Sequence, residues 1–440
     1  MNIFLSLIIL LGIQICIVEF TRKKGFKYDF FSVLNFIYVL VYVVTPLYYT
    51  AQSEISINDA TESLFYSILG YQFILAGWIL GQKKRNKTRI LNDDQKIKID
   101  KKWIIISIYA FWISIISFTI LTISRGGISN AIAQGALSRY SIEEVESSSF
   151  AFLSRIVALL PFLSLIFFYF FLKRKEYSYP NKILFYFYFS LSMSVLQAFI
   201  SASRGGLLRI FLMYLLLTTL LKANINFKKL IFFCVFFVLF VSYGKQTFYA
   251  VSNYFYSGES ISESFNYLND ARKTDEQSKG DLIFREFSHP SLSINAAVKY
   301  NEVDGRYTYF RDFTWSILRI IPQRLTTFLD RPEPINVINT HQLRNNFGGG
   351  IPPGLIASFY YSLGTIGVVL GGLFYGYLGR YLNDILIVKI NSSPLYLTFF
   401  IYFSFFYGFF VTNGDPNVYI YYIIFPALLI FIGNKSLKFR

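Results

Sequence analysis

Apolar residues fill long stretches of this chain, and shorter polar segments separate them. An apolar run of about 18 residues forms a helix that can cross the hydrocarbon layer of a bilayer. By this rule we expect an all-α polytopic integral membrane protein with about eleven transmembrane helices. These helices are expected near residues 3–20, 30–50, 62–82, 103–123, 151–172, 182–202, 206–221, 229–248, 353–378, 394–411 and 417–433.

The polar segments sort into two sets by charge. The basic segments are 22–24, 83–102, 173–175, 222–229 and 435–440, and the segments poor in lysine are 52–62, 124–149, 249–352 and 412–417. The two sets alternate along the chain, as they must if each apolar run crosses the membrane once. Because basic loops remain in the cytoplasm, we expect the N-terminus outside and the C-terminus in the cytoplasm.

Composition agrees with a membrane protein. Of the 440 residues, 54% are hydrophobic and 15% are charged, whereas soluble domains are about a quarter charged. A net charge of +16 would suit nucleic acid in a soluble protein, but here most lysines and arginines lie in loops between apolar runs, as topology requires. We therefore expect contact with a lipid bilayer and none with nucleic acid.

One long polar segment divides the chain into three parts. We expect an N-terminal bundle of about eight helices over residues 1–248, a large outer loop over 249–352, and a C-terminal bundle of about three helices over 353–440. Within the loop, apolar spacing predicts one or two short helices over 281–299, broken near Pro290. It also predicts an interfacial helix over 310–325 that ends or kinks at Pro322.

The same tetrapeptide occurs twice, as Ser124-Arg-Gly-Gly127 and Ser203-Arg-Gly-Gly206, each at the expected outer end of a span. A guanidinium offers a planar fork of donors to phosphate oxygens, and adjacent glycines let backbone amides approach an anion as well. Arg125 and Arg204 are therefore candidate anion ligands, with Arg209 on the same helix wall as Arg204. The alternative is that these arginines reach toward lipid headgroups beside a flexible helix end.

The outer loop contains further candidates. Arg285-Glu-Phe-Ser-His289 gathers a cation, a carboxylate and an imidazole within five residues, which could orient a pyrophosphate and supply a general base. The alternative is a solvated loop with incidental charges. The remaining candidates are His341 and Arg344 before the glycine run, Arg319 in the interfacial helix, and Asp415, which either forms the last outer turn or lies in the site.

Several common nucleotide and metal motifs are absent. The sequence has no Walker loop, no dinucleotide fingerprint, no Asp-x-Asp motif and no metal-spaced His/Cys cluster. We expect no cofactor and no metal, so the substrate must already be activated. A polyprenyl-pyrophosphate sugar meets this requirement, because arginines can neutralise the pyrophosphate as it leaves.

Three stretches resemble the O-antigen polymerase (Wzy-type) family of oligosaccharide repeat-unit polymerases. They are the Ser-Arg-Gly step within 201–207, the Gly-rich start of a helix within 348–367, and Thr412-Asn-Gly-Asp415. In the last stretch the family often has an Arg-Gly-Asp-like turn, and Asn413 replaces the arginine here. The plan of many spans with one large late outer loop covers the whole chain.

The resemblance implies an enzyme of the bacterial inner membrane, with the N-terminus in the periplasm. It would transfer a growing glycan from undecaprenyl pyrophosphate to the next lipid-linked repeat unit at the periplasmic face, without a metal. The product would be O-antigen or a capsule-like polysaccharide, and a chain-length regulator is a possible protein partner. Arg204 and Arg285 would hold the pyrophosphate with Arg209 or Arg319, and the base would be His289 or Glu286, then Asp415 or His341.

Two other functions fit the same plan. An O-antigen ligase shares the architecture, but ligases resemble one another in a His-Asn pair where this chain has Pro353-Gly354. A flippase or transporter of the lipid-linked unit would show internal repeats and mid-membrane sites. The polar residues here gather on one expected face, which favours chemistry at that face.

Overall fold

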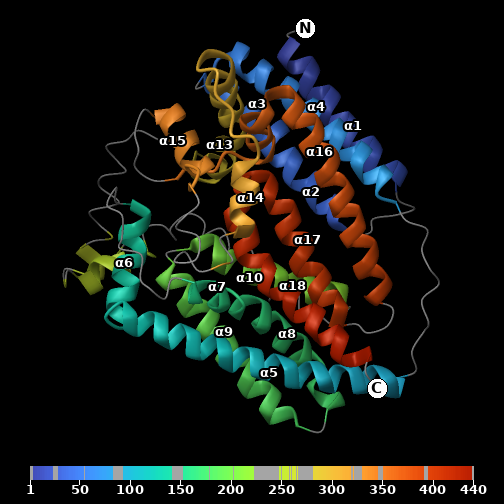
Figure 1. The fold of residues 1–440 in the computed structure, drawn as a ribbon, viewed down its shortest axis with the longest axis vertical. Coiled ribbons are helices and arrows are strands. Elements are labelled where there is room, and N and C mark those ends of the chain that lie inside the picture. The colour runs from blue at the N-terminus through green and yellow to red at the C-terminus, as the bar shows by residue number, and fades with distance from the viewer. Residues whose placement is uncertain are drawn as a thin grey trace. The chain divides into compact units, whose positions relative to one another are not determined.

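The computed structural model describes residues 3–22, 28–53, 55–82, 93–140, 152–177, 179–201, 203–221, 281–318, 330–344, 350–390 and 395–438, with a few short pieces between 247 and 265 and residue 321. Every regular element within these ranges is a helix, and no strand occurs there (Figure 1). The all-helical prediction is confirmed for this part of the chain.

Nine of the described helices are long and apolar enough to cross a membrane, as a polytopic membrane protein requires. The first group is α1 (Ile3–Arg22), α2 (Phe30–Val39) continued by η1 (Leu40–Val44) and α3 (Thr45–Ala51), and α4 (Ile57–Leu80). The second is α5 (Asp93–Ser124), α7 (Leu153–Val157) continued by α8 (Leu160–Leu172), and α9 (Pro180–Ile200). The third is α16 (Leu355–Ile390), α17 (Leu395–Asn413) and α18 (Pro416–Lys438).

Two predicted spans are not among these nine. Helix α10 (Arg204–Leu220) matches the run at 206–221 but is shorter than the others. The run at 229–248 lies almost wholly outside the described residues. The total of about eleven therefore stays a prediction.

The chain divides into two compact units, and each draws on separate parts of the sequence. Unit 1 comprises residues 1–88, 284–389 and 403–420. Within it α4 and α16 run side by side (Figure 1). A Cβ at Gly77 would overlap the carbonyl of Leu373, and one at Gly376 would overlap the carbonyl of Ile74. Glycine at both positions lets the two backbones approach closely, as small residues do between membrane helices.

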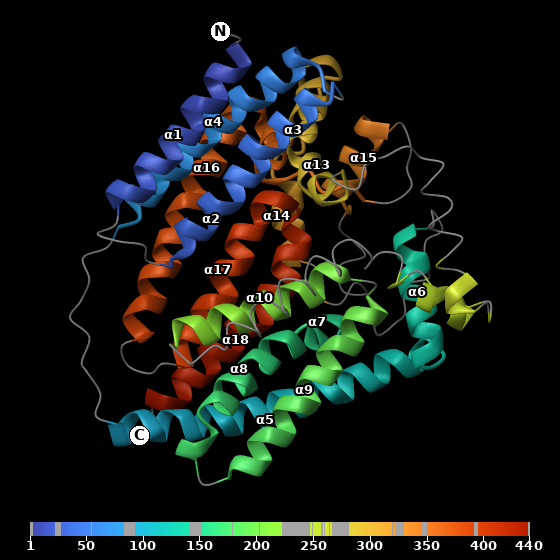
Figure 2. The same cartoon turned by 180° about the vertical axis from the view of Figure 1, so that it is seen from behind.

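Unit 2 comprises residues 89–283, 390–402 and 421–440, and aromatic side chains fill its interior. Helices α8 and α9 pack along each other (Figure 2). Trp103 of α5 lies against Phe399 of α17, with ring centroids 5.0 Å apart. Phe162 of α8 lies edge-on to Tyr402 of α17 at 4.8 Å, a favoured aromatic geometry.

The predicted outer loop contains short helices that pack within unit 1. They are α13 (Asp281–Val298), η3 (Lys299–Val303), α14 (Arg311–Leu318) and α15 (Ile335–Arg344). The predicted break near Pro290 is wrong, because α13 continues through that residue. Pro290 is buried against Gly354, so tertiary packing outweighs the local cost of the proline.

Candidate functional site

Polar side chains gather in two groups, one in each unit. The first group begins where α5 ends, at the first copy of the repeated tetrapeptide. The amide of Gly127 donates to the carbonyl of Thr122 at 2.8 Å, and that of Gly126 to Ile123 at 3.0 Å. With φ of +83° at Gly126, this is a Schellman cap, which requires a left-handed residue just past the helix end. The glycines therefore stop α5 and leave Arg125 at its tip.

Arg125 shares its surroundings with Arg155 of α7 and Tyr421 of α18. The hydroxyl of Tyr421 donates to the carbonyl of Ser154 at 2.7 Å, and both arginines interact electrostatically with this tyrosine. Burial lowers the pKa of Arg125, and only the nearby Tyr421 opposes that effect. Neither arginine forms an ion pair with a described carboxylate. One buried nitrogen of Arg155 has no hydrogen-bond partner among the described residues.

The second copy of the tetrapeptide starts a helix instead of ending one. Ser203 caps α10, and its hydroxyl accepts a hydrogen bond of 3.1 Å from the amide of Gly206. One turn on, Nε of Arg209 donates to the carbonyl of Gly205 at 3.0 Å. Its guanidinium lies 4.6 Å from the ring centroid of Tyr422, within range of a cation–π contact. Arg204 is the first residue of α10, and its side chain lies outside the described part of the structure.

We name Arg125, Arg155 and Arg209 the arginine group. All three approach the consecutive residues Tyr421 and Tyr422 of α18. All three side chains are half-buried, and a buried nitrogen of Arg155 lacks a hydrogen-bond partner among the described residues. A guanidinium that is partly removed from water gains by binding an anion. The arginine group is thus suited to a phosphate or pyrophosphate.

The second group lies in unit 1 and contains two buried carboxyls. Asp415 precedes α18 and is 4% exposed, and Asp312 in the first turn of α14 is 2% exposed. Oδ1 of Asp415 accepts hydrogen bonds from the amide of Asn417 at 2.8 Å and from its side-chain nitrogen at 3.0 Å. Oδ2 of Asp312 is buried without a partner among the described residues.

The glycine-rich stretch before α16 packs against the turn that carries Asp415. The amide of Gly354 donates to the carbonyl of Asn413 at 3.2 Å, and the hydroxyl of Ser358 donates to the carbonyl of Gly414 at 2.6 Å. Two of the three stretches that carry the family resemblance are therefore in direct contact.

A buried amide links the helices of the predicted outer loop. Nδ2 of Asn339 in α15 donates to Oγ of Ser293 in α13 at 2.9 Å and to the carbonyl of Ile351 at 3.0 Å. The hydroxyl of Tyr361 in α16 donates to Oδ1 of Asn339 at 3.0 Å. The fully buried Asn339 therefore fixes α13, α15 and the start of α16 relative to one another.

The predicted site residues of the loop occupy this frame. His289 on α13 and His341 on α15 are half-buried, and Arg344 is exposed at the end of α15. Arg285 and Glu286 belong to α13, but their side chains lie outside what the structure describes, as does Arg319. Their proposed roles stay predictions.

Sequence reasoning missed Asp312. It lies in the predicted interfacial helix, and that prediction rested on apolar residues and interleaved arginines without considering this carboxyl. Asp312 and Ser316 are one turn apart and both buried, so helical spacing already placed a polar stripe beside the apolar one. No group of three or more His, Cys, Asp or Glu suited to a metal occurs among the described residues.

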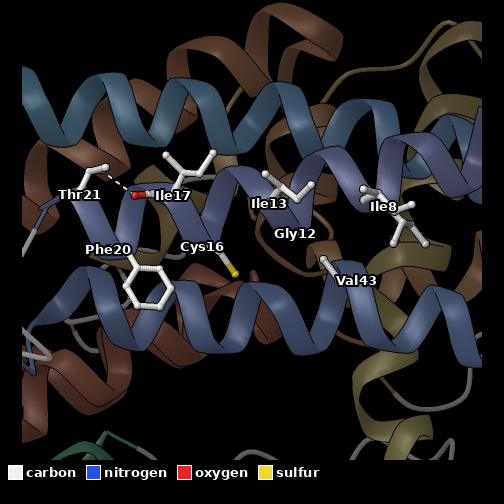
Figure 3. A pocket seen from close by; sticks show the side chains of 9 residues that line it. Ile8, Gly12, Ile13, Cys16, Ile17, Phe20, Thr21 and Val43 are labelled. Atoms are coloured by element: carbon white, nitrogen blue, oxygen red, sulfur yellow. Dashed lines mark hydrogen bonds between the residues drawn. The ribbon is translucent and has the colours of Figure 1, made fainter.

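An apolar groove of about 570 Å³ lies on α1 beside η1 in unit 1 (Figure 3). Ile8, Ile13, Phe20 and Val43 contribute to its lining. The hydroxyl of Thr21 there donates to the carbonyl of Ile17 at 2.7 Å. The lining offers no charge to hold an anion, so the arginine group of unit 2 and the buried carboxyls of unit 1 remain two separate candidate groups.

Comparison of the chain with models of protein families, with curated proteins and with solved structures finds no match.

Proposed function

We propose that this chain is a membrane glycosyltransferase that polymerises undecaprenyl-pyrophosphate-linked oligosaccharide repeat units into an O-antigen or capsule-like polysaccharide. The observation that carries the proposal is the arginine group, whose members Arg125 and Arg155 have no acidic partner among the described residues. Half-buried cations without a counter-ion among the described residues favour the binding of an anion, and a lipid-linked pyrophosphate is an anion that reaches such a site from the bilayer.

The chemistry follows from the leaving group. The acceptor sugar hydroxyl attacks the anomeric carbon of the donor glycan, and the bond from that carbon to the pyrophosphate oxygen breaks. The electron pair leaves with the pyrophosphate, where arginines stabilise the developing charge. Arg125 and Arg209 are assigned to this role, with Arg204 at the start of α10 as a further ligand. Because the substrate brings its own activation, no nucleotide is needed at the site.

The setting of the reaction belongs to the same proposal. The enzyme lies in the inner membrane with its N-terminus in the periplasm and its C-terminus in the cytoplasm, and the transfer takes place at the periplasmic face. The charge alternation of the loops supports this orientation. Its partners are lipid-linked glycans and, for control of length, a chain-length regulator protein.

The test is a gel analysis of glycans from a strain lacking this protein. The deletion should leave a single repeat unit on lipid A-core, and the wild-type gene should restore a ladder. Arg125→Ala and Arg209→Ala should each lose the ladder. Arg174→Ala is the matched control, because Arg174 also stacks on an aromatic ring, that of Phe171 at 4.4 Å, but lies in a basic loop outside the arginine group.

Other outcomes identify the competing functions. Long lipid-linked polymer without any glycan on lipid A-core would indicate an O-antigen ligase. Absence of outward-facing lipid-linked units would indicate a flippase. A full ladder with both Arg125→Ala and Arg209→Ala would contradict the assignment of the arginine group.

A further inference from the structure

Helix α16 is broken within its membrane-spanning length. Leu363 and Gly364 have non-helical backbone angles, and Gly364, with φ of +60°, adopts a conformation that other residues rarely take. The break lies about 13 Å along the helix axis from Leu355. Lipid cannot satisfy the backbone groups that a break releases, so a broken membrane helix needs polar partners from protein, water or a ligand.

Three donors from the segment 301–309 reach the carbonyls above the break. Nδ2 of Asn301 donates to the carbonyl of Tyr360. Backbone amides supply the other two bonds, which are Thr308 to Tyr361 at 2.9 Å and Tyr309 to Ser362 at 3.0 Å. The last carbonyls of the upper part of α16 therefore accept hydrogen bonds from outside the helix.

The segment reaches these carbonyls through a strained turn. Tyr309 and the following Phe310 have φ of +50° and +58°, a region that is costly for residues with a side chain. Such strain persists only where the surroundings hold it, and it concentrates at functional sites. The contact between this segment and the break is thus a specific feature of the fold.

The same contacts release three amides below the break. In an unbroken α-helix, the carbonyls of residues 360–362 would accept from the amides of Gly364, Thr365 and Ile366. The non-helical angles at the break turn these amides away, and the donors of the segment 301–309 take their place. The amides form the N-terminus of the lower part of α16, residues 365–390, where backbone donors have no partner in their own helix.

Asn301 supplies an acceptor at the same place. It is 3% exposed, and its Oδ1 is buried without a partner among the described residues. Because Nδ2 is committed to the carbonyl of Tyr360, the unpaired atom is the oxygen. Nδ2 would lie 3.8 Å from a Cβ on Gly364, so the side-chain amide of Asn301 points into the break.

The break is open on one side and has aromatic rings beside it. Gly364 is buried, whereas Thr365 and Ile366 are exposed. Cε1 of Tyr307 would lie 3.6 Å from a Cβ on Gly364. Tyr307 is 39% and Tyr309 63% exposed, and their ring centroids are 5.9 Å apart. Exposed tyrosine rings offer a ligand a large and rigid contact surface.

The polar groups at the break favour a neutral ligand with hydroxyl groups. An anion would pair with the released amides but not with Oδ1 of Asn301, and the segment 301–309 carries two carboxylates, Glu302 and Asp304, against one cation, Arg306. A cation would pair with that oxygen but not with the amides. A hydroxyl both accepts and donates a hydrogen bond, so it meets both requirements.

We propose that the break in α16 is a binding site for the hydroxyl groups of a sugar. The three released amides donate to hydroxyl oxygens, Oδ1 of Asn301 accepts from a hydroxyl, and the sugar ring packs on Tyr307. All of these residues belong to unit 1, so the site needs no residue of unit 2. That the sugar is part of a glycan repeat unit rests on the proposed function, whereas the hydrogen-bonding geometry does not.

Hydrogen exchange of the full chain in phosphatidylcholine nanodiscs, resolved by residue, tests the site. Without sugar, the amides of Gly364, Thr365 and Ile366 should exchange rapidly, and that of Gly371, inside the lower part of α16, should exchange slowly. The water-soluble repeat-unit oligosaccharide, cleaved from its lipid, should slow the three amides about 100-fold at about 100 times its Kd. Slow exchange before the oligosaccharide is added would overturn the proposal, because the amides would then be bonded within the protein.

Two further outcomes identify other occupants. Rapid exchange that the oligosaccharide does not change would mean that water alone fills the break. Phosphatidylglycerol carries hydroxyls in its headgroup, so protection in phosphatidylglycerol nanodiscs without oligosaccharide would assign the site to lipid. Either result would overturn the sugar site.

Gly364→Ala should abolish the protection by oligosaccharide. Its Cβ would enter the space between Tyr307 and Asn301, at 3.6 Å and 3.8 Å from their nearest atoms. Gly305→Ala is the matched control, because Gly305 also has a positive φ, +65°, but has open space around it. Full protection in a folded Gly364→Ala variant would contradict the site.

Polymerisation of lipid-linked repeat units separates this site from the proposed function. Polymerisation by a wild-type chain whose three amides stay unprotected would overturn the sugar site and leave the proposed function standing. Protection of the amides without polymerisation would overturn the proposed function and leave a sugar-binding membrane protein.

Discussion

The amide of Gly354 donates a hydrogen bond of 3.2 Å to the carbonyl of Asn413, which joins the entrance of α16 to the turn between α17 and α18. Both sides of this contact depend on glycine. Gly354 has φ of +77° and Gly414 has φ of +64°, and a Cβ at Gly414 would overlap the carbonyl of Gly354. The turn that presents Asp415 is therefore shaped by residues far from it in sequence.

Gly354→Ala should destabilise the protein through both backbone strain and overlap with Pro290. A left-handed alanine costs about 1–2 kcal/mol, and overpacking adds about 1–3 kcal/mol. The midpoint of thermal unfolding in detergent measures the loss. Gly258→Ala is a matched control, because Gly258 also has φ of +77° but has open space around it. Equal losses in the two variants would show that the contact with Pro290 contributes nothing.

Arg155→Met should raise stability while lowering polymerisation. A buried nitrogen of Arg155 lacks a hydrogen-bond partner among the described residues. Removing an unsatisfied buried polar group should raise the free energy of unfolding by about 1–3 kcal/mol. Arg380→Met provides the contrast, because Nε of Arg380 lies 2.9 Å from Oδ2 of Asp384, and its loss leaves that carboxylate unpaired. Thermal unfolding without substrate separates the two. If Arg155→Met lost as much stability as Arg380→Met, an anion would not be required at Arg155.

Arg22→Ala should be strongly destabilising, because it leaves the buried Asp29 and the half-buried Glu19 without their cation. Nη1 of Arg22 lies 2.6 Å from Asp29 and Nη2 lies 3.0 Å from Glu19, and these side chains are at most 22% exposed. Removing one partner of a buried ion pair costs about 3–5 kcal/mol.

Lys173→Ala is the control for Arg22→Ala. The partner of Lys173 is Glu176, which is 57% exposed, and an exposed pair contributes about 0–1 kcal/mol. Unfolding midpoints of both variants in the same detergent provide the comparison. A loss for Arg22→Ala no larger than that for Lys173→Ala would mean that Glu19 and Asp29 are solvated in the membrane-embedded protein.

Stability should also depend on pH through Asp312. Burial, and then the charge of Asp415, raise its pKa to about 7, above the value near 3.9 of an unfolded chain, so the folded state binds more protons between these values. Stability contributed by the protonated carboxyl is complete below about pH 4 and is lost as the pH rises through about 7. Asp312→Asn should abolish that loss, whereas Asp330→Asn, at an exposed position, should keep it. Parallel stability curves for wild type and Asp312→Asn from acid to neutral pH would contradict the assignment.

The apolar runs predicted the positions of nine helices because length and hydropathy alone decide whether a segment can cross a bilayer. Length and hydropathy did not predict where every helix ends. Helix α16 extends to Ile390, past the predicted end at residue 378, and the Arg380–Asp384 pair lets it continue through polar sequence. A pair one turn apart stabilises a helix without any apolar run.

The candidate site was predicted in part. The repeated tetrapeptide led to Arg125 and Arg204, since an arginine beside two glycines is a local pattern, and helical spacing from Arg204 led to Arg209. The sequence could not show that one copy ends α5 and the other begins α10, because both use the same four residues. Asp312 was missed because its significance comes from Asp415, which is close only after folding.

Reconstitution of the purified chain in liposomes with an undecaprenyl-pyrophosphate-linked repeat unit tests the central claim most directly. Polymer length on a gel and released undecaprenyl pyrophosphate are measured together, with Arg125→Ala and Arg174→Ala alongside the wild type. We expect a ladder with one undecaprenyl pyrophosphate released for each unit added, retained in Arg174→Ala and lost in Arg125→Ala. Repeat units that stay single and lipid-linked with the folded wild-type chain would contradict the account.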